Sequence, residues 1–211
     1  MTEQLPDERP QRRREYSGAS STLGVAMLIV VAVGVALWFF EFRDGGSSNG
    51  ASTSGLGVVE LPAGLNPTAK APAAELGRAA PNFRLQSPDG GVSTLDSFRG
   101  KYVLLNFWAS WCGPCRGETP DLQALSERQS AKLTVLGVNQ QEDAAAAKQF
   151  MAQFNLSYPI VLDSSGDVSQ AYRVSGLPMS FLIDPDGVVK KIYVGRISSD
   201  DLRKIEAEEI S

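Results

Sequence analysis

The chain has 211 residues, a formal net charge of −4 at neutral pH, two cysteines and no histidine. This length allows one ordinary domain with appendages, and the slightly acidic balance without a basic face argues against nucleic acid as a partner. The absence of histidine excludes Ser-His-Asp and Cys-His catalytic pairs, histidine metal ligands and haem attachment through Cys-x-x-Cys-His. Two cysteines alone cannot complete a structural zinc site either, so we predict no metal and no cofactor.

Residues 22–40 form an uncharged apolar run that predicts a membrane-spanning helix. Such a helix rises about 28 Å at 1.5 Å per residue, close to the hydrocarbon thickness of a bilayer. Arginines cluster before the run and only Arg43 closely follows it, which places the N-terminus in the cytoplasm. A cleaved signal peptide is the alternative, although residues 41–44 offer no small-x-small cleavage site. Arg13-Arg14 also leaves twin-arginine export open.

The chain divides into four predicted segments. We expect a cytoplasmic tail at 1–21, a signal-anchor helix at 22–40, a flexible extracytoplasmic linker at 41–75 and a folded domain at 76–211. The linker is rich in Gly and Ser and then in Ala and Pro, a composition that buries too little apolar surface to fold. This organisation predicts a single-pass cell-membrane protein with its folded domain outside the cytoplasm.

The folded domain begins with a predicted hairpin of strands at 82–85 and 92–95, followed by a buried strand at 101–108 and a helix at 116–129. The elements predicted after these are a strand at 133–138, a helix at 142–154 closed by Asn155, a strand at 158–162, a short helix at 167–172, a hairpin of strands at 179–183 and 188–194, and an amphipathic helix at 199–209 with Leu202 and Ile205 facing inward. Strands that alternate with helices and end in a hairpin and helix predict an α/β fold with a mixed central sheet.

Both cysteines lie in Cys112-Gly113-Pro114-Cys115, between the buried strand and the helix. Cys-x-x-Cys in this position is typical of a thiol-disulfide redox site. The N-terminus of a helix favours negative charge and lowers the pKa of a cysteine, so Cys112 is predicted to be the attacking thiolate and Cys115 the residue that resolves the mixed disulfide. A static disulfide is the alternative, but so short a loop constrains the unfolded chain very little.

These residues resemble the thioredoxin superfamily. The resemblance is carried by the run from Phe107 to Cys115, by Pro120 in the helix, by Gly176-Leu177-Pro178 and by residues 194–198. Within the superfamily the chain is most similar to the membrane-anchored TlpA/ResA branch of redoxin (AhpC/TSA-like) proteins. The features shared with this branch are the opening at 79–83, the added N-terminal hairpin, the inserted helix and strand at 142–162, the anchor, the linker, Asn106 in place of a buried acid, and Glu118 three residues after the second cysteine.

The resemblance implies a thioredoxin-like fold and roles for further residues. Glu118 would handle the proton of the buried Cys115, although a solvated glutamate near a helix N-terminus is the simpler interpretation. Pro178 would follow a cis peptide bond opposite Cys112, where an ordinary trans proline is the alternative. The backbones of Leu177 and Met179 would pair with an extended substrate strand. Trp111 would shape the surface beside the nucleophile, or would simply be a packed aromatic residue.

The leading functional hypothesis is a membrane-tethered thiol-disulfide oxidoreductase acting on protein disulfides outside the cytoplasm. The resemblance implies apocytochrome c or copper-site assembly proteins as substrates and a membrane thiol carrier as reductant. The Gly-Pro pair and the lack of histidine between the cysteines favour a reductase over a strong oxidant.

Two other activities remain open from the sequence. A copper(I)-binding assembly chaperone would use both thiolates as soft ligands, although related proteins add a histidine. A thiol peroxidase would use a threonine three residues before its peroxidatic cysteine, where this chain has Ala109.

Overall fold

The computed structural model of the chain describes residues 31, 33 and 55–210. The predicted cytoplasmic tail at 1–21, nearly all of the predicted anchor at 22–40 and the linker up to residue 54 lie outside these described residues. Within the described part of the chain, no helix is both long and apolar enough to cross a membrane.

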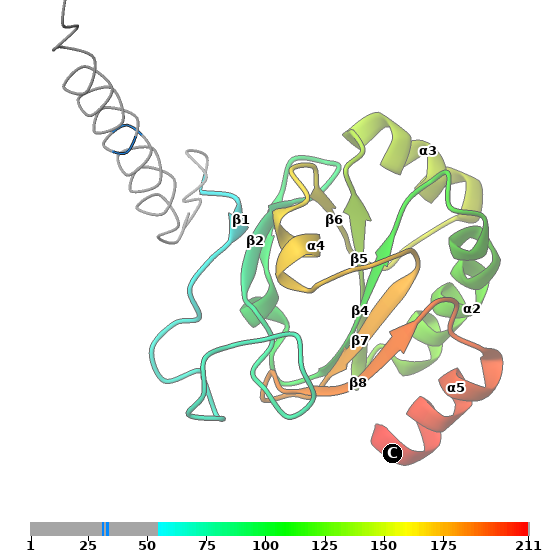
Figure 1. The fold of residues 1–211 in the computed structure, drawn as a ribbon. Coiled ribbons are helices and arrows are strands. Elements are labelled where there is room, and N and C mark those ends of the chain that lie inside the picture. The colour runs from blue at the N-terminus through cyan, green and yellow to red at the C-terminus, as the bar shows by residue number, and fades with distance from the viewer. Residues whose placement is uncertain (1–30, 32, 34–54, 211) are drawn as a thin grey trace, which may run out of the picture. The chain divides into compact units, whose positions relative to one another are not determined.

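An eight-stranded mixed sheet forms the centre of the folded unit (Figure 1). Its order is β1-β2-β6-β5-β4-β7-β8, with β3 paired to β2 outside this path. The strands β4, β5 and β6 run parallel to one another, and β7 is antiparallel to both β4 and β8. The strand bounds are β1 Gly57–Val58, β2 Phe83–Gln86, β3 Val92–Thr94, β4 Tyr102–Trp108, β5 Leu133–Gln140, β6 Ile160–Asp163, β7 Met179–Ile183 and β8 Val189–Val194. The predicted α/β fold with a mixed sheet is confirmed.

Helices cover both faces of this sheet (Figure 1). Their bounds are η1 Leu95–Phe98, α2 Gly113–Gln129, α3 Ala144–Phe154, α4 Asp167–Ala171, α5 Ser199–Lys204 and η2 Ile205–Glu209. Buried side chains of α2, α3 and α5 share one apolar cluster, whereas η1 and α4 contribute to the other. The two clusters lie on opposite faces because side chains alternate along each strand.

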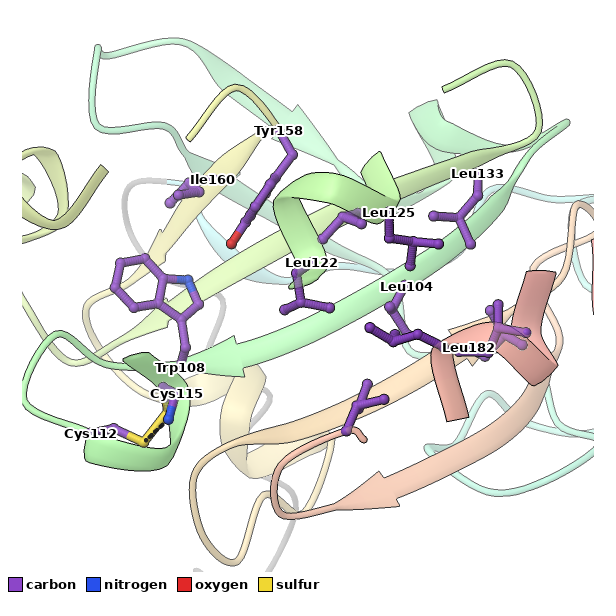
Figure 2. Packing of buried hydrophobic residues seen from close by; sticks show 14 of the residues in the cluster. Leu104, Trp108, Cys112, Cys115, Leu122, Leu125, Leu133, Tyr158, Ile160 and Leu182 are labelled. Atoms are coloured by element: carbon purple, nitrogen blue, oxygen red, sulfur yellow. Dashed lines mark hydrogen bonds between the residues drawn. A yellow bond between two sulfur atoms is a disulfide. The ribbon is translucent and has the colours of Figure 1, made fainter. Parts of the chain in front are cut away.

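The central strand β4 shows this alternation most clearly. Leu104 and Trp108 belong to the cluster beneath α2, where Figure 2 shows Leu122 and Leu125 packing with them. Val103, Leu105 and Phe107 belong to the opposite cluster. Six of the seven β4 residues are buried, as expected of a strand in the middle of a sheet covered on both faces. The strand is therefore a rigid support for the loop that follows it.

The predicted elements are present, but several begin or end at other residues. The helix predicted from residue 116 begins at Gly113, because Cys112 is its N-cap. The helix predicted from Glu142 begins at Ala144, because the side chain of Asp143 accepts a hydrogen bond from the Ala146 N–H at 2.8 Å and so caps it. Asn155 ends this helix in the left-handed conformation, at φ 50° and ψ 46°. The last predicted helix continues beyond α5 as the π-helical turn η2.

The folded domain begins earlier than the predicted boundary near residue 76. Gly57 and Val58 form β1, which pairs antiparallel with β2. The Val59 N–H donates to the Asn82 carbonyl at 3.0 Å, and the Asn82 side chain donates to the Glu60 carbonyl at 3.4 Å. On the side of residues 57–60 these contacts use only backbone groups, so the side-chain composition of the segment gave no sign of them. The predicted flexible linker therefore does not extend to residue 75.

Candidate active site

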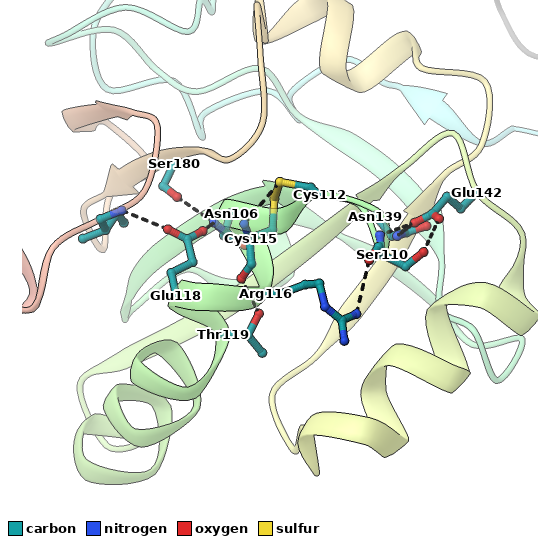
Figure 3. Close-up of a disulfide and its surroundings, with 11 residues drawn as sticks. Asn106, Ser110, Cys112, Cys115, Arg116, Glu118, Thr119, Asn139, Glu142 and Ser180 are labelled. Atoms are coloured by element: carbon teal, nitrogen blue, oxygen red, sulfur yellow. Dashed lines mark hydrogen bonds between the residues drawn. A yellow bond between two sulfur atoms is a disulfide. The ribbon is translucent and has the colours of Figure 1, made fainter.

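Cys112 lies where β4 has ended and α2 begins (Figure 3). Its backbone is extended, at φ −76° and ψ 109°, and its Sγ accepts a hydrogen bond from the Cys115 N–H at 3.2 Å. Gly113 and Pro114 form the first turn of α2, where a missing proline N–H removes no intrahelical bond. The sulfur therefore meets the unpaired N–H groups of the helix end, the environment that stabilises a thiolate.

Cys112 and Cys115 form a disulfide with their Cα atoms 5.3 Å apart. Cys112 is 4% exposed and Cys115 is 1% exposed, whereas the neighbouring Trp111 is 72% exposed. Of the two buried cysteines, Cys112 is thus the less buried one, and it lies next to the exposed Trp111. The exposed indole of Trp111 is an apolar surface at that point, so it is not a packed core aromatic.

Pro178 directly precedes β7, and the Leu177–Pro178 peptide bond is cis. Leu177 packs against the apolar cluster that contains both cysteines. The Pro178 carbonyl accepts a hydrogen bond from the Gly195 N–H at 2.9 Å. These contacts bring the segment at 177–178 and the disulfide to the same end of the sheet.

The predicted pairing of the Met179 backbone with a substrate strand does not fit its position. Met179 is paired with Phe107 of β4 on one side and with Val194 of β8 on the other. Its backbone groups therefore face strands of the same sheet in both directions. Leu177 precedes β7, so its backbone alone remains a candidate for pairing with substrate.

Glu118 lies on the first turns of α2 and is 1% exposed. Its Oε1 accepts a hydrogen bond from Asn106 Nδ2 at 2.8 Å, and its Oε2 accepts one from the Ile197 N–H at 2.9 Å. Asn106 Nδ2 also donates to Ser180 Oγ at 2.9 Å. The carboxyl group is thus held by Asn106 of β4 and by Ile197 in the segment after β8, and Ser180 of β7 holds Asn106 in turn. It is not a solvated helix-terminal glutamate.

Burial is the main influence on the Glu118 carboxyl group and raises its pKa above the ordinary value of 4.5. The hydrogen bonds from Ile197 and Asn106 and the positive charge of Arg196 oppose this effect without cancelling it. A buried carboxyl group with a raised pKa thus lies one turn from Cys115 on the same helix, a position suited to a proton acceptor for that cysteine.

A second polar cluster flanks the disulfide and was not predicted from the sequence (Figure 3). Glu142 Oε2 accepts hydrogen bonds of 2.7 Å from the Ser110 N–H and from Asn139 Nδ2, and its Oε1 accepts one of 2.5 Å from Ser110 Oγ. Trp108 and Asn139 are paired across the parallel strands β4 and β5, so the residues after them meet at one edge of the sheet. That common edge is the signal by which the sequence could have pointed to Ser110 and Glu142.

Residues 75–208 match the protein-family model described as Redoxin. The chain is 38% identical over 135 residues to the thiol-disulfide oxidoreductase ResA of Geobacillus thermodenitrificans, an alignment that covers 63% of this chain and 76% of the relative. It is 36% identical over 131 residues to the thioredoxin-like protein YneN of Bacillus subtilis, covering 61% and 76%.

Two solved structures share the fold. A Chlorobium tepidum protein assigned as thiol:disulfide interchange protein DsbE superimposes with a TM-score of 0.58 at 35% identity, covering 63% of this chain and 93% of that one. A secreted Mycobacterium tuberculosis disulfide oxidoreductase, homologous to E. coli DsbE, gives a TM-score of 0.53 at 26% identity, covering 57% and 90%. The chain belongs to the Redoxin family and is a thiol-disulfide oxidoreductase of the ResA/DsbE type.

Proposed function

We propose that the protein is a membrane-tethered reductase of protein disulfides outside the cytoplasm. The observation that carries this proposal is the Cys112–Cys115 disulfide at the N-terminus of α2, with the buried Glu118 carboxyl group on the same helix. The N-terminal position favours a thiolate at Cys112, and the raised pKa of Glu118 suits a proton acceptor for Cys115. The name of the ResA relatives supports the same chemistry.

The reaction begins with the reduced dithiol form. The Cys112 thiolate attacks one sulfur of a substrate disulfide, forms a mixed disulfide and expels the other substrate sulfur as a thiolate. Glu118 takes the proton of Cys115, whose thiolate attacks Cys112 Sγ, forms the Cys112–Cys115 bond and expels the second substrate sulfur. Two electrons have then passed from the protein to the substrate, and a membrane thiol carrier restores the dithiol.

The surface around the disulfide supports a protein as the substrate. Trp111 is 72% exposed and Val194, at the end of β8, is 75% exposed. Val194 is paired with Met179, which directly follows Pro178. Exposed apolar side chains of this size at the end of the sheet that carries the disulfide suit a polypeptide that covers them. Apocytochrome c before haem attachment and copper-site assembly proteins are the substrates we propose to test first.

Neither alternative activity is favoured. Ala109, at the position of a peroxidase threonine, is fully buried and has no hydroxyl group to offer. The relatives and solved structures named above are oxidoreductases, disulfide interchange proteins or thioredoxin-like proteins.

Trapping tests the proposed function. In cells that express the full-length Cys115→Ser variant, Cys112 can attack a substrate but the mixed disulfide cannot resolve, so we expect disulfide-linked complexes that mass spectrometry identifies. The Cys112→Ser variant is the matched control and should trap nothing. If both variants give the same complexes, or neither gives any, the proposal fails.

Labelling tests the proposed location. The only cysteines of the chain are Cys112 and Cys115, so after reduction a membrane-impermeant maleimide should label the wild-type chain in intact spheroplasts. The variant lacking both cysteines gives the background. Extraction of the membranes with alkaline carbonate should leave the chain in the pellet, and its release into the soluble fraction would instead support a cleaved signal peptide.

A further inference from the structure

Ser110 lies in the tight turn that carries the nucleophile. The Cys112 N–H donates to the Ala109 carbonyl at 3.1 Å, which closes a turn with Ser110 and Trp111 at its two central positions. Ser110 and Trp111 therefore connect the end of β4 to Cys112 through one closed turn. The position of Ser110 decides how Cys112 is presented to Cys115 and to a substrate.

One carboxylate holds Ser110 from the side of β5. Glu142 accepts hydrogen bonds from both the backbone N–H and the Oγ of Ser110, at 2.7 Å and 2.5 Å. Asn139, which is fully buried, donates to the same carboxylate at 2.7 Å and fixes it in turn. Hydrogen bonds to a charged acceptor are the stronger kind, and two from a single residue define its position.

A guanidinium group holds Ser110 from the other side. Arg116 Nη1 donates to the Ser110 carbonyl at 3.4 Å. The same guanidinium carbon lies 5.6 Å from the ring centre of Phe150 and 5.2 Å from that of Phe154, both on α3. Ser110 is thus held between α2 and the segment that joins β5 to α3, so all of its polar groups have partners.

We propose that Glu142 is a positioning residue that sets the redox behaviour of the Cys112–Cys115 pair. By fixing Ser110, it keeps Cys112 Sγ within reach of Cys115 and so raises the effective concentration of one sulfur for the other. A higher effective concentration favours closure of the disulfide and makes the dithiol a stronger reductant. The inference rests on the proposed function, because it concerns the step in which Cys115 attacks Cys112 Sγ and expels the substrate thiolate.

The test compares variants of the full-length chain in detergent, equilibrated in dithiothreitol or glutathione redox buffers and quantified by alkylation. For Glu142→Ala we expect the equilibrium constant for disulfide closure to fall about tenfold, equal to a reduction potential roughly 30 mV less negative for a two-electron couple. The rate at which a glutathione mixed disulfide at Cys112 resolves should fall by a similar factor.

Two matched variants distinguish the effect of the hydrogen bonds that position Ser110 from the effect of the negative charge near the disulfide. Glu142→Gln removes the charge and one acceptor oxygen but keeps an oxygen that can accept one of the two bonds from Ser110. It should lower the equilibrium constant and the resolution rate about threefold, less than Glu142→Ala does. Asp143→Ala removes the adjacent carboxylate, which caps α3 through Ala146 and makes no hydrogen bond to Ser110. It should leave both quantities unchanged. The proposal would be overturned if the reduction potential shifts equally in the Glu142→Ala and Glu142→Gln variants. It would also be overturned if Glu142→Ala has the wild-type potential and resolution rate.

Glu142→Ala leaves the buried amide of Asn139 without its carboxylate acceptor, and this variant can therefore fail to fold. A third variant, which keeps Glu142, tests the proposal in that case. Ser110→Ala removes one of the two bonds to Glu142 and should lower the equilibrium constant about threefold, which corresponds to roughly 15 mV. A folded Ser110→Ala variant with the wild-type potential would contradict the proposal. If the wild-type chain itself reduces no protein disulfide, the proposed function fails; if it does so and the variants match it, only the role of Glu142 fails.

Discussion

The side-chain amide of Asn106 donates a 2.8 Å hydrogen bond to the carboxyl group of Glu118, and both residues are at least 98% buried. Asn106 lies on β4, before the active-site loop, and Glu118 lies on α2, after it. The pair therefore joins the two elements that flank the disulfide. Both carboxyl oxygens of Glu118 and the amide NH2 of Asn106 have hydrogen-bond partners, which include Ser180 and the Ile197 N–H, and these partners make the burial of the pair tolerable.

Glu118 should make the stability of the protein depend on pH. Burial raises the pKa of its carboxyl group in the folded chain, so the folded chain keeps this proton at pH values where the unfolded chain has released it. The contribution of Glu118 to stability is then fully present below its unfolded value near 4.5 and is lost as the pH rises through the raised folded value. The Glu118→Gln variant has no proton to release, and its free energy of unfolding should vary less over this window.

Urea unfolding of the oxidised domain between about pH 4 and pH 8 measures this difference. Glu127, an exposed residue of the same helix, provides the control. The Glu127→Gln variant should follow the wild-type pH dependence. A Glu118→Gln variant with the wild-type pH dependence would show that Glu118 is not the group responsible.

Ser180→Ala should destabilise the domain by about 1–3 kcal/mol. The substitution leaves one N–H of the buried Asn106 amide without its acceptor, and an unpaired buried donor carries that cost. The midpoint of urea unfolding measures the loss. Ser175, which is exposed, is the matched serine, and Ser175→Ala should change stability by less than about 0.5 kcal/mol. Equal midpoints for the two variants would contradict the assigned bond.

Trp111→Ala should weaken the reaction with protein disulfides selectively. The indole is 72% exposed, so its removal should change stability by less than about 0.5 kcal/mol. We expect kcat/KM for a protein disulfide to fall about tenfold, equal to roughly 1.4 kcal/mol of lost binding energy. The rate with a small aromatic disulfide should stay within about twofold of wild type, because the thiolate itself is unchanged.

An exposed apolar residue outside this surface gives the control. Val92 on β3 is 49% exposed, and Val92→Ala should leave both rates at the wild-type value. If Trp111→Ala slows the two kinds of substrate equally, the indole acts on the chemistry of Cys112 and not on recognition of the partner.

Gly137→Ala should destabilise the domain by about 1–3 kcal/mol. A Cβ at this position of β5 would lie 2.9 Å from Trp108 Nε1, 3.2 Å from Ile160 Cγ1 and 3.3 Å from Tyr158 Cε2. The Trp108 ring would have to move away from the added Cβ. It packs against Phe150 with 4.3 Å between ring centres, so it has little freedom to move. Thermal unfolding measures the effect. Gly176→Ala, where no atom lies within 4 Å of the added carbon, should be close to neutral; if it is as destabilising as Gly137→Ala, crowding is not the cause.

Periodicity predicted most of the elements, because these are built from local patterns, but it did not predict β1 or η1. The apolar run at 101–108 became β4, and the alternation at 92–95 became β3 beside β2. The ends were harder to predict, since they depend on single side chains. Asp143 caps α3 and so excludes Glu142 from the helix. That exclusion frees the Glu142 side chain to reach Ser110, which lies 32 positions earlier in the chain.

The sequence by itself determined the redox chemistry, because both cysteines occur in one four-residue motif between a strand and a helix. It also indicated which of them attacks, since the helix end lies on the side of Cys112. Only the tertiary structure decided what surrounds them. Hydrogen bonds from Asn106 and Ile197 to Glu118, and from Ser110 to Glu142, join residues distant in the chain. Such contacts depend on how strands and helices pack, a property that no local pattern of residues contains.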